Sequence, residues 1–200
     1  TLITAWLGQL PFSTFPWKIK HCAWVSLDEH DNEPVRFLQY LIAASIYEEE
    51  TGWDVLAIAL DSQGDTLWTN RYDSGTDEKA VSCEINRVTN TFYILAASLE
   101  YGARWTMRLL AIDRTGALLS HAELEPAGDA NIFPGRICIA VDGSLRMLTS
   151  DLFANNVLVS SVTPPSTINW TSVIPYAVGT DLRMQSNNTI LTGWETTGSN

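Results

Sequence analysis

Short apolar runs separated by polar turns recur along the chain at a nearly constant interval. The run YLIAAS at residues 40–45 returns as YILAAS at residues 93–98. Related runs stand at residues 1–6, 146–150 and 189–194. Runs of this length that are rich in β-branched, aromatic and other apolar residues are typical of strands. The pattern therefore predicts one strand type that occurs five times.

Three further strand types fill the interval between these copies. The second stands at residues 53–61, 105–113 and 156–162, and the third at 15–20, 67–72, 118–124 and 169–174. The fourth, at 22–27, 80–85, 136–141 and 180–184, leads back to the first. Four strands in each unit of about 50 residues are typical of β-propeller blades. We therefore expect an all-β propeller of about four repeats of four antiparallel strands, with units at roughly 1–40, 41–93, 94–146 and 147–194.

Polar turns join the second strand type to the third at residues 61–64 (DSQG) and 113–116 (DRTG). The aspartate of such a turn accepts hydrogen bonds from the turn's own amides, and the glycine adopts the positive φ angle that other side chains resist. The Asp-Gly pair at residues 142–143 lies between two apolar runs, which predicts a further hairpin.

Residues 34–50 have a second interpretation, as a helix. Asn32 precedes the stretch and Gly52 follows it, and these are residues that begin and end helices. Three glutamates at 48–50 would then lie at the negative end of the helix dipole, which is unfavourable. The register shared with residues 93–98 favours the strand.

The intervals between copies of the first strand type are uneven. From Ile3 to Ile42, Leu95, Leu148 and Leu191 they are 39, 53, 53 and 43 residues. Most propellers have 4–8 blades, so two arrangements stay open: a small closed ring in which both ends share a blade, or an arc of a larger ring. Residues 1–200 are accordingly a single propeller domain or a propeller fragment. A start inside a predicted strand, without methionine, favours the arc.

Charge and hydropathy argue against a nucleic-acid partner and against a membrane-spanning helix. The chain has 23 acidic and 12 basic residues, for a net charge of −11. This sign opposes a phosphate backbone, so we expect no nucleic-acid partner. No apolar run approaches the roughly 18–20 residues that a membrane-spanning helix needs. Such a surface suits a basic partner or a cation.

Residues that carry chemistry are sparse. The chain has no nucleophile elbow, zinc-binding histidine pair, phosphate loop or dinucleotide fingerprint. Cys22, Cys83 and Cys138 are more than 50 residues apart and lack metal-ligand spacing. We expect three buried thiols, with one disulfide and a free thiol as the alternative. We expect no catalytic residue, no metal and no cofactor.

Acidic side chains gather on both rims of the predicted propeller. One rim has the longer loops and is made of Glu48, Glu49, Glu50, Asp73, Asp77, Glu78, Glu100 and Asp129. The opposite rim carries the acidic residues within 28–33 together with Asp61, Asp65, Asp113 and Asp142. Because long loops more often carry function, we take the rim with the longer loops as the candidate binding surface.

The repeat unit resembles the bacterial pyrroloquinoline-quinone-like β-propeller repeats, and it is similar to the repeats of secreted and outer-membrane propellers. In that family an Ala-x-Asp, a glycine turn and a tryptophan dock adjacent blades. Ala59, Asp61, Gly64 and Trp68 match these positions, whereas Ser120 replaces the tryptophan in the next copy. The quinone site of the family needs a vicinal cysteine pair, which this chain lacks. The resemblance implies a scaffold that is extracellular, at the cell surface or periplasmic.

We therefore expect a non-catalytic module that presents loops on a rigid propeller to a protein or carbohydrate partner, or to further blades or subunits. Two alternatives stay open. One is a propeller enzyme, either a quinone-dependent dehydrogenase or a glycan-cleaving enzyme. The other is a structural subunit of a surface filament or multiprotein complex, whose edge strands pair with a neighbour.

Overall fold

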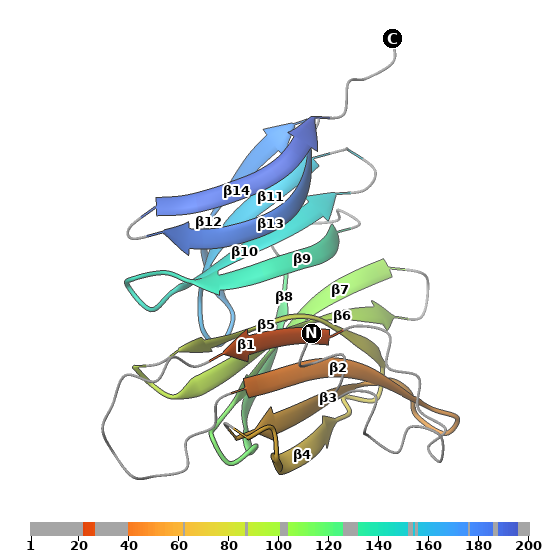
Figure 1. Cartoon of the computed structure of the whole chain (residues 1–200). Helices are drawn as coiled ribbons and strands as arrows, with labels where there is room; N and C mark the ends of the chain where they lie inside the picture. The colour runs from red at the N-terminus through yellow and green to blue at the C-terminus, as the bar shows by residue number, and fades with distance from the viewer. Residues whose placement is uncertain are drawn as a thin grey trace.

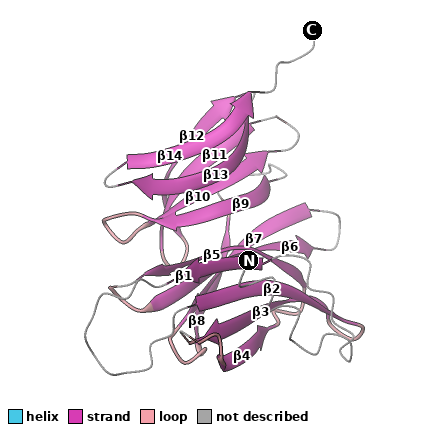
Figure 2. Cartoon of the chain, in the orientation of Figure 1, coloured by secondary structure: helices cyan, strands magenta, loops and turns pink. Residues whose placement is uncertain are grey.

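The computed structural model describes residues 22–26, 40–61, 63–86, 88–100, 104–125, 132–151, 154, 156–175, 177–185 and 188–195. These residues form strands and turns, and none of them is helical (Figure 2). No helix long and apolar enough to cross a membrane occurs in this part of the chain.

The described strands form four antiparallel sheets, each in chain order (Figure 1). Sheet 1 contains β1 (Cys22–Ser26), β2 (Tyr40–Glu48), β3 (Gly52–Leu60) and β4 (Thr66–Tyr72). Sheet 2 contains β5 (Asp77–Asn86), β6 (Thr91–Glu100), β7 (Arg104–Ile112) and β8 (Leu118–Leu124). Sheet 3 contains β9 (Ile132–Ile139), β10 (Leu145–Asp151), β11 (Asn156–Thr163) and β12 (Thr167–Pro175). Sheet 4 contains β13 (Ala177–Gln185) and β14 (Asn188–Glu195).

The prediction of an all-β fold built from repeated antiparallel sheets is confirmed. The first predicted strand type forms β2, β6, β10 and β14, and in each sheet a strand of the fourth type precedes it. Residues 40–48 form β2, so the strand interpretation of this stretch is confirmed over those residues. The copies expected at residues 1–6 and 15–20 lie outside the described residues.

Burial explains the difference between the middle and outer strands. β2 and β3 are apolar along most of their length because both of their faces are buried. β4 and β8 alternate between exposed and partly buried positions, as strands at the edge of a sheet do. The sequence pattern therefore identifies the middle strands by continuous apolar runs and the outer strands by alternation.

The sheets pack face to face, and each interface has its own apolar core. β5 contacts β1 on one side and β9 on the other, and β9 contacts β13 (Figure 1). Sheets 1 and 2 share a core that includes Leu41, Val55, Phe92, Ile94 and Leu110. Sheets 2 and 3 share Leu95, Leu109, Ile137, Met147 and Leu158. Sheets 3 and 4 share Cys138, Leu148, Val159 and Leu182.

A β-bulge recurs at the same place in the three four-stranded sheets. The pairing of the third strand with the fourth shifts by one residue at Ala59/Leu60, at Ala111/Ile112 and at Ser161/Val162. A bulge increases the local twist and changes the direction of the following side chains. The structural repeat is therefore more regular than the sequence repeat, because the third copy has lost both the aspartate and the glycine of its turn.

Candidate functional site

Two of the predicted rim residues, Glu48 and Asp73, bind Arg71 on β4. One terminal guanidinium nitrogen of Arg71 contacts the Glu48 carboxylate, and the other lies 3.3 Å from Asp73 Oδ2. Arg71 Nε lies 2.9 Å from Oδ2 of Asp54, whose side chain is fully buried. Burial raises the pKa of Asp54, and a hydrogen bond from Thr51 and the charge of Arg71 only partly oppose it. A single guanidinium therefore contacts three carboxylates in this part of the rim.

Asp77 and Glu78, at the start of β5, both accept hydrogen bonds from within the protein. Asp77 Oδ1 accepts a hydrogen bond of 3.0 Å from the backbone N–H of Trp53 in sheet 1. Glu78 is 2% exposed and accepts a hydrogen bond of 2.9 Å from Thr76 Oγ1. Burial raises the pKa of Glu78. The Thr76 hydrogen bond and the charge of Arg108, 3.7 Å away, lower that pKa by less, so it stays above its ordinary value. Both carboxylates thus take part in packing interactions within the protein.

The remaining rim residues lie in other settings. Glu49 and Glu50 are exposed in the turn between β2 and β3, and Glu100 ends β6. Asp129 lies outside the described residues. Within the part of the chain that the structure describes, no group of three or more histidine, cysteine, aspartate or glutamate residues has the geometry to hold a metal ion. The acidic rim as a binding surface remains a prediction.

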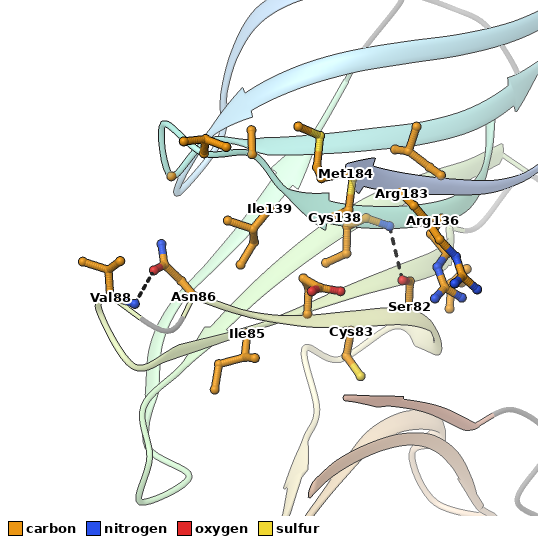
Figure 3. A pocket seen from close by; sticks show the side chains of 17 residues that line it. Ser82, Cys83, Ile85, Asn86, Val88, Arg136, Cys138, Ile139, Arg183 and Met184 are labelled. Atoms are coloured by element: carbon orange, nitrogen blue, oxygen red, sulfur yellow. Dashed lines mark hydrogen bonds between the residues drawn. The ribbon is translucent and has the colours of Figure 1, made fainter. Parts of the chain in front are cut away.

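A different site lies along β5, β9 and β13, the first strands of sheets 2, 3 and 4, which we call the inner strands. A groove of about 880 Å3 is lined by β5, β9 and β13 and by the loops that follow β5 and β9 (Figure 3). A hydrogen bond of 3.2 Å from the backbone N–H of Ile137 to Ser82 Oγ joins β9 to β5 beside it. The volume lies within the range of about 300–1,000 Å3 that is usual for ligand pockets.

Two arginines lie side by side at one end of this groove (Figure 3). Arg136 Nε lies 3.1 Å from Asp181 Oδ1, and Arg183 Nε donates a hydrogen bond of 2.8 Å to Asp181 Oδ2. Burial by itself raises the pKa of Asp181, but the Arg183 hydrogen bond and the Arg136 charge outweigh it and lower that pKa. The pair is exposed, at 45% for Arg136 and 73% for Arg183. Each guanidinium has five N–H donors, so donors other than Nε are present at this end.

The opposite end of the groove has an exposed apolar side chain beside an amide. Val88 lies there, next to Asn86, whose Oδ1 accepts a hydrogen bond from the Val88 N–H (Figure 3). Val88 is 93% exposed, and Val141, another lining residue, is 75% exposed. The groove therefore combines a cationic end with exposed apolar side chains, although the chain as a whole is strongly acidic.

Cys138 also lines the groove, and its thiol is a poor nucleophile. Burial raises the pKa of Cys138 to about 12, whereas the thiolate is the form that reacts. Cys83 and Cys138 are both buried, as expected for two of the three cysteines. The Cys22 side chain lies outside the description.

Arg136, Asp181 and Arg183 were not predicted as site residues. Residues 136–141 and 180–184 belong to the same predicted strand type, which is a signal that they lie on neighbouring first strands of successive sheets. Net charge and loop length favoured the acidic loops instead, because no other property of the sequence distinguished one surface from another.

In comparisons with known proteins, no family model matches the chain, and no curated protein matches it significantly. The resemblance to pyrroloquinoline-quinone-like repeats therefore remains a prediction from residues 59–68 and their copies, and family membership is not established.

Proposed function

We propose that the chain is a non-catalytic binding module whose sheets are blades of a β-propeller, and that the groove along β5, β9 and β13 holds its ligand. The observation that carries this proposal is the groove itself, which inner strands of three successive sheets line together. Inner strands from successive blades surround the centre of a propeller. The separate apolar cores between the sheets make this surface rigid.

The lining favours a ligand that has a carboxylate next to an apolar part. The paired guanidiniums of Arg136 and Arg183 offer planar donor sets, which match carboxylates in a bidentate manner. Val88 and Val141 offer apolar contact area elsewhere in the groove. The high pKa of the Cys138 thiol supports binding without covalent catalysis. A peptide with an acidic residue or free carboxyl end has this chemistry, and so does an acidic oligosaccharide.

The test is selection of ligands on the full chain, followed by substitution of the arginine pair. A random peptide library and an array of acidic and neutral oligosaccharides are screened against wild-type protein. We expect enriched ligands that contain a carboxylate and that bind at least about tenfold more weakly to the Arg136→Gln/Arg183→Gln variant. Arg114→Gln removes an exposed arginine from a turn outside the groove, and this matched control should bind normally. Ligands that bind the double variant as tightly as wild type would exclude the groove as the site.

A further inference from the structure

The inner strands carry a second set of β-bulges, one in each of the three sheets that line the groove. In each of these sheets the pairing of the first strand with the second skips one residue. The skipped residues are Val81 in β5, Gly135 in β9 and Thr180 in β13. Bulges are frequent next to functional sites, because they change the direction of the side chains around them. The residues that directly follow these bulges are Ser82, Arg136 and Asp181.

Two of these side chains connect one inner strand to the next. Ser82 Oγ accepts the 3.2 Å hydrogen bond from the Ile137 N–H, which joins β5 to β9. Arg136 Nε lies 3.1 Å from Asp181 Oδ1, which joins β9 to β13. Ser82 and Arg136 lie near each other at the cationic end of the groove (Figure 3). The residues after the bulges therefore build this end.

Asp181 is fixed between the two arginines. Its carboxylate oxygens are divided between the guanidiniums, with Oδ1 at Arg136 Nε and Oδ2 at Arg183 Nε. Arg183 stands two residues further along β13, so its side chain lies on the same face of the strand. The Leu182 N–H donates a 3.0 Å hydrogen bond to Asp181 Oδ1, and Leu182 is 1% exposed in the core between sheets 3 and 4. The backbone of a buried residue thus holds the carboxylate in place.

The contacts through Nε leave the outer part of each guanidinium available. Within the part of the chain that the structure describes, neither Arg136 nor Arg183 has a hydrogen bond or ion pair with a residue other than Asp181. A guanidinium has five N–H donors, and only one of them is on Nε. Two guanidiniums at one carboxylate would repel each other without it. Two positive charges against one negative charge leave the cluster cationic, with paired donors for a further anion.

We propose that Asp181 is a positioning residue of the groove, which holds Arg136 and Arg183 side by side so that both donate to one ligand carboxylate. Because this role rests on the function proposed above, the groove must first be a ligand site. A different role for Asp181 makes the opposite prediction. If its carboxylate only competes with the ligand for the arginines, its removal strengthens binding.

Asp181→Asn separates the two roles, because it removes the negative charge and keeps the size of the side chain. A carboxylate accepts hydrogen bonds at both oxygens, whereas an amide has one acceptor oxygen and an NH2 group that donates. Asparagine can therefore hold one guanidinium, and its NH2 group faces the other. Positioning predicts weaker binding of a carboxylate even though the cluster has gained positive charge, whereas competition predicts tighter binding.

The probe is butyrate, a carboxylate with a short apolar chain, and butyramide is its uncharged counterpart. Each is titrated into the isotope-labelled full chain at constant ionic strength, in a buffer without carboxylates, and NMR follows the backbone amide shifts of β9 and β13. We expect saturable shifts with butyrate only, and a dissociation constant at least about tenfold higher in Asp181→Asn, as the loss of one charge-assisted hydrogen bond gives. Asp181→Glu restores both acceptor oxygens and should bind more tightly than Asp181→Asn. Asp65→Asn changes the net charge equally in an exposed turn of sheet 1, outside the groove lining, and should bind normally.

Circular dichroism and the unfolding midpoint are measured for each variant. Weaker binding by Asp181→Asn at an unchanged midpoint, with recovery in Asp181→Glu, supports the positioning role. Unchanged or tighter binding by Asp181→Asn overturns it and leaves the groove as a ligand site. A lowered midpoint without recovery in Asp181→Glu assigns Asp181 to folding and also overturns it. Absence of saturable butyrate binding to wild type overturns it as well, and binding that Arg136→Gln/Arg183→Gln leaves unchanged refutes the groove together with this role.

Discussion

Gly116 is the position where a single methyl group most directly tests the docking of sheet 1 on sheet 2. Its φ angle is +86°, and its carbonyl accepts the Asn70 and Tyr72 hydrogen bonds. A Cβ atom added here would lie 2.3 Å from Asn70 Nδ2 and 3.0 Å from Trp68 Cε3. Asn70, Tyr72 and Trp68 all belong to the preceding sheet, so Gly116→Ala acts on the contact between the sheets.

Two costs determine the expected size of the effect. A positive φ angle costs a residue other than glycine roughly 1–2 kcal/mol. Displacing Asn70 and the Trp68 indole from their carbonyl acceptors removes two hydrogen bonds, at about 1 kcal/mol each. We therefore expect Gly116→Ala to lower the free energy of unfolding by about 3–4 kcal/mol. This is a large fraction of the roughly 5–15 kcal/mol that stabilises a typical protein.

Gly143→Ala is the matched control. Gly143 lies in a similar turn with a φ angle of +80°, but the nearest atom to an added Cβ is Asn86 Nδ2 at 3.8 Å, which is an ordinary contact. This variant has the backbone cost alone, about 1–2 kcal/mol. Urea denaturation of both variants and wild type, followed by tryptophan fluorescence and circular dichroism, measures the difference. Equal losses in the two variants would refute the docking contribution.

Three further predictions concern buried polar groups. Because the pKa of Glu78 is raised in the folded chain, wild-type stability falls as the pH rises from the ordinary glutamate range toward neutrality. Glu78→Gln removes this slope, so its unfolding free energy relative to wild type should increase between about pH 4 and about pH 7 in urea titrations, and a constant difference contradicts this. Ser82→Ala leaves the Ile137 N–H without its buried acceptor and should cost about 1–3 kcal/mol in the same assay; an unchanged stability would show that the N–H finds another acceptor. Because the pKa of Cys138 is raised to about 12, its thiol should resist iodoacetamide in the folded chain near about pH 8 and react in urea, and peptide mass spectrometry that finds rapid native labelling contradicts its burial.

The strands were predictable because each strand type has a distinct local pattern. β2 and β6 are buried on both faces and therefore share a continuous apolar run. The Asp113–Gly116 turn was predictable from its chemistry, since Asp113 Oδ1 accepts hydrogen bonds from the Thr115 and Ala117 amides. The bulges were not predictable, because residues as different as Ala59 and Ser161 precede them.

The candidate site was harder to predict because charge pairing depends on distant strands. Glu48 belongs to a run of three glutamates that appears exposed in the sequence, yet it binds Arg71 on a strand two positions away. Glu78 lies beside a loop and is nevertheless almost fully buried. Arg136 and Arg183 come from different sheets and meet only at Asp181. A sequence gives the number of charges, whereas the register and stacking of sheets determine which of them remain on the surface.

The docking contacts between sheets 1 and 2 and the arginine pair of the groove lie on different strands, and this separation has a measurable consequence. The outer strand β4 docks on the turn between β7 and β8 of sheet 2, where Trp68 donates to the Arg114 carbonyl and Asn70 to the Gly116 carbonyl. The inner strands β9 and β13 place Arg136 and Arg183 on the surface of a groove, where both side chains are exposed. Exposed ion pairs contribute little to folding, about 0–1 kcal/mol. If the groove is a binding site on a rigid scaffold, Arg136→Gln/Arg183→Gln leaves the unfolding midpoint nearly unchanged and weakens ligand binding by at least about tenfold, whereas Gly116→Ala lowers the midpoint.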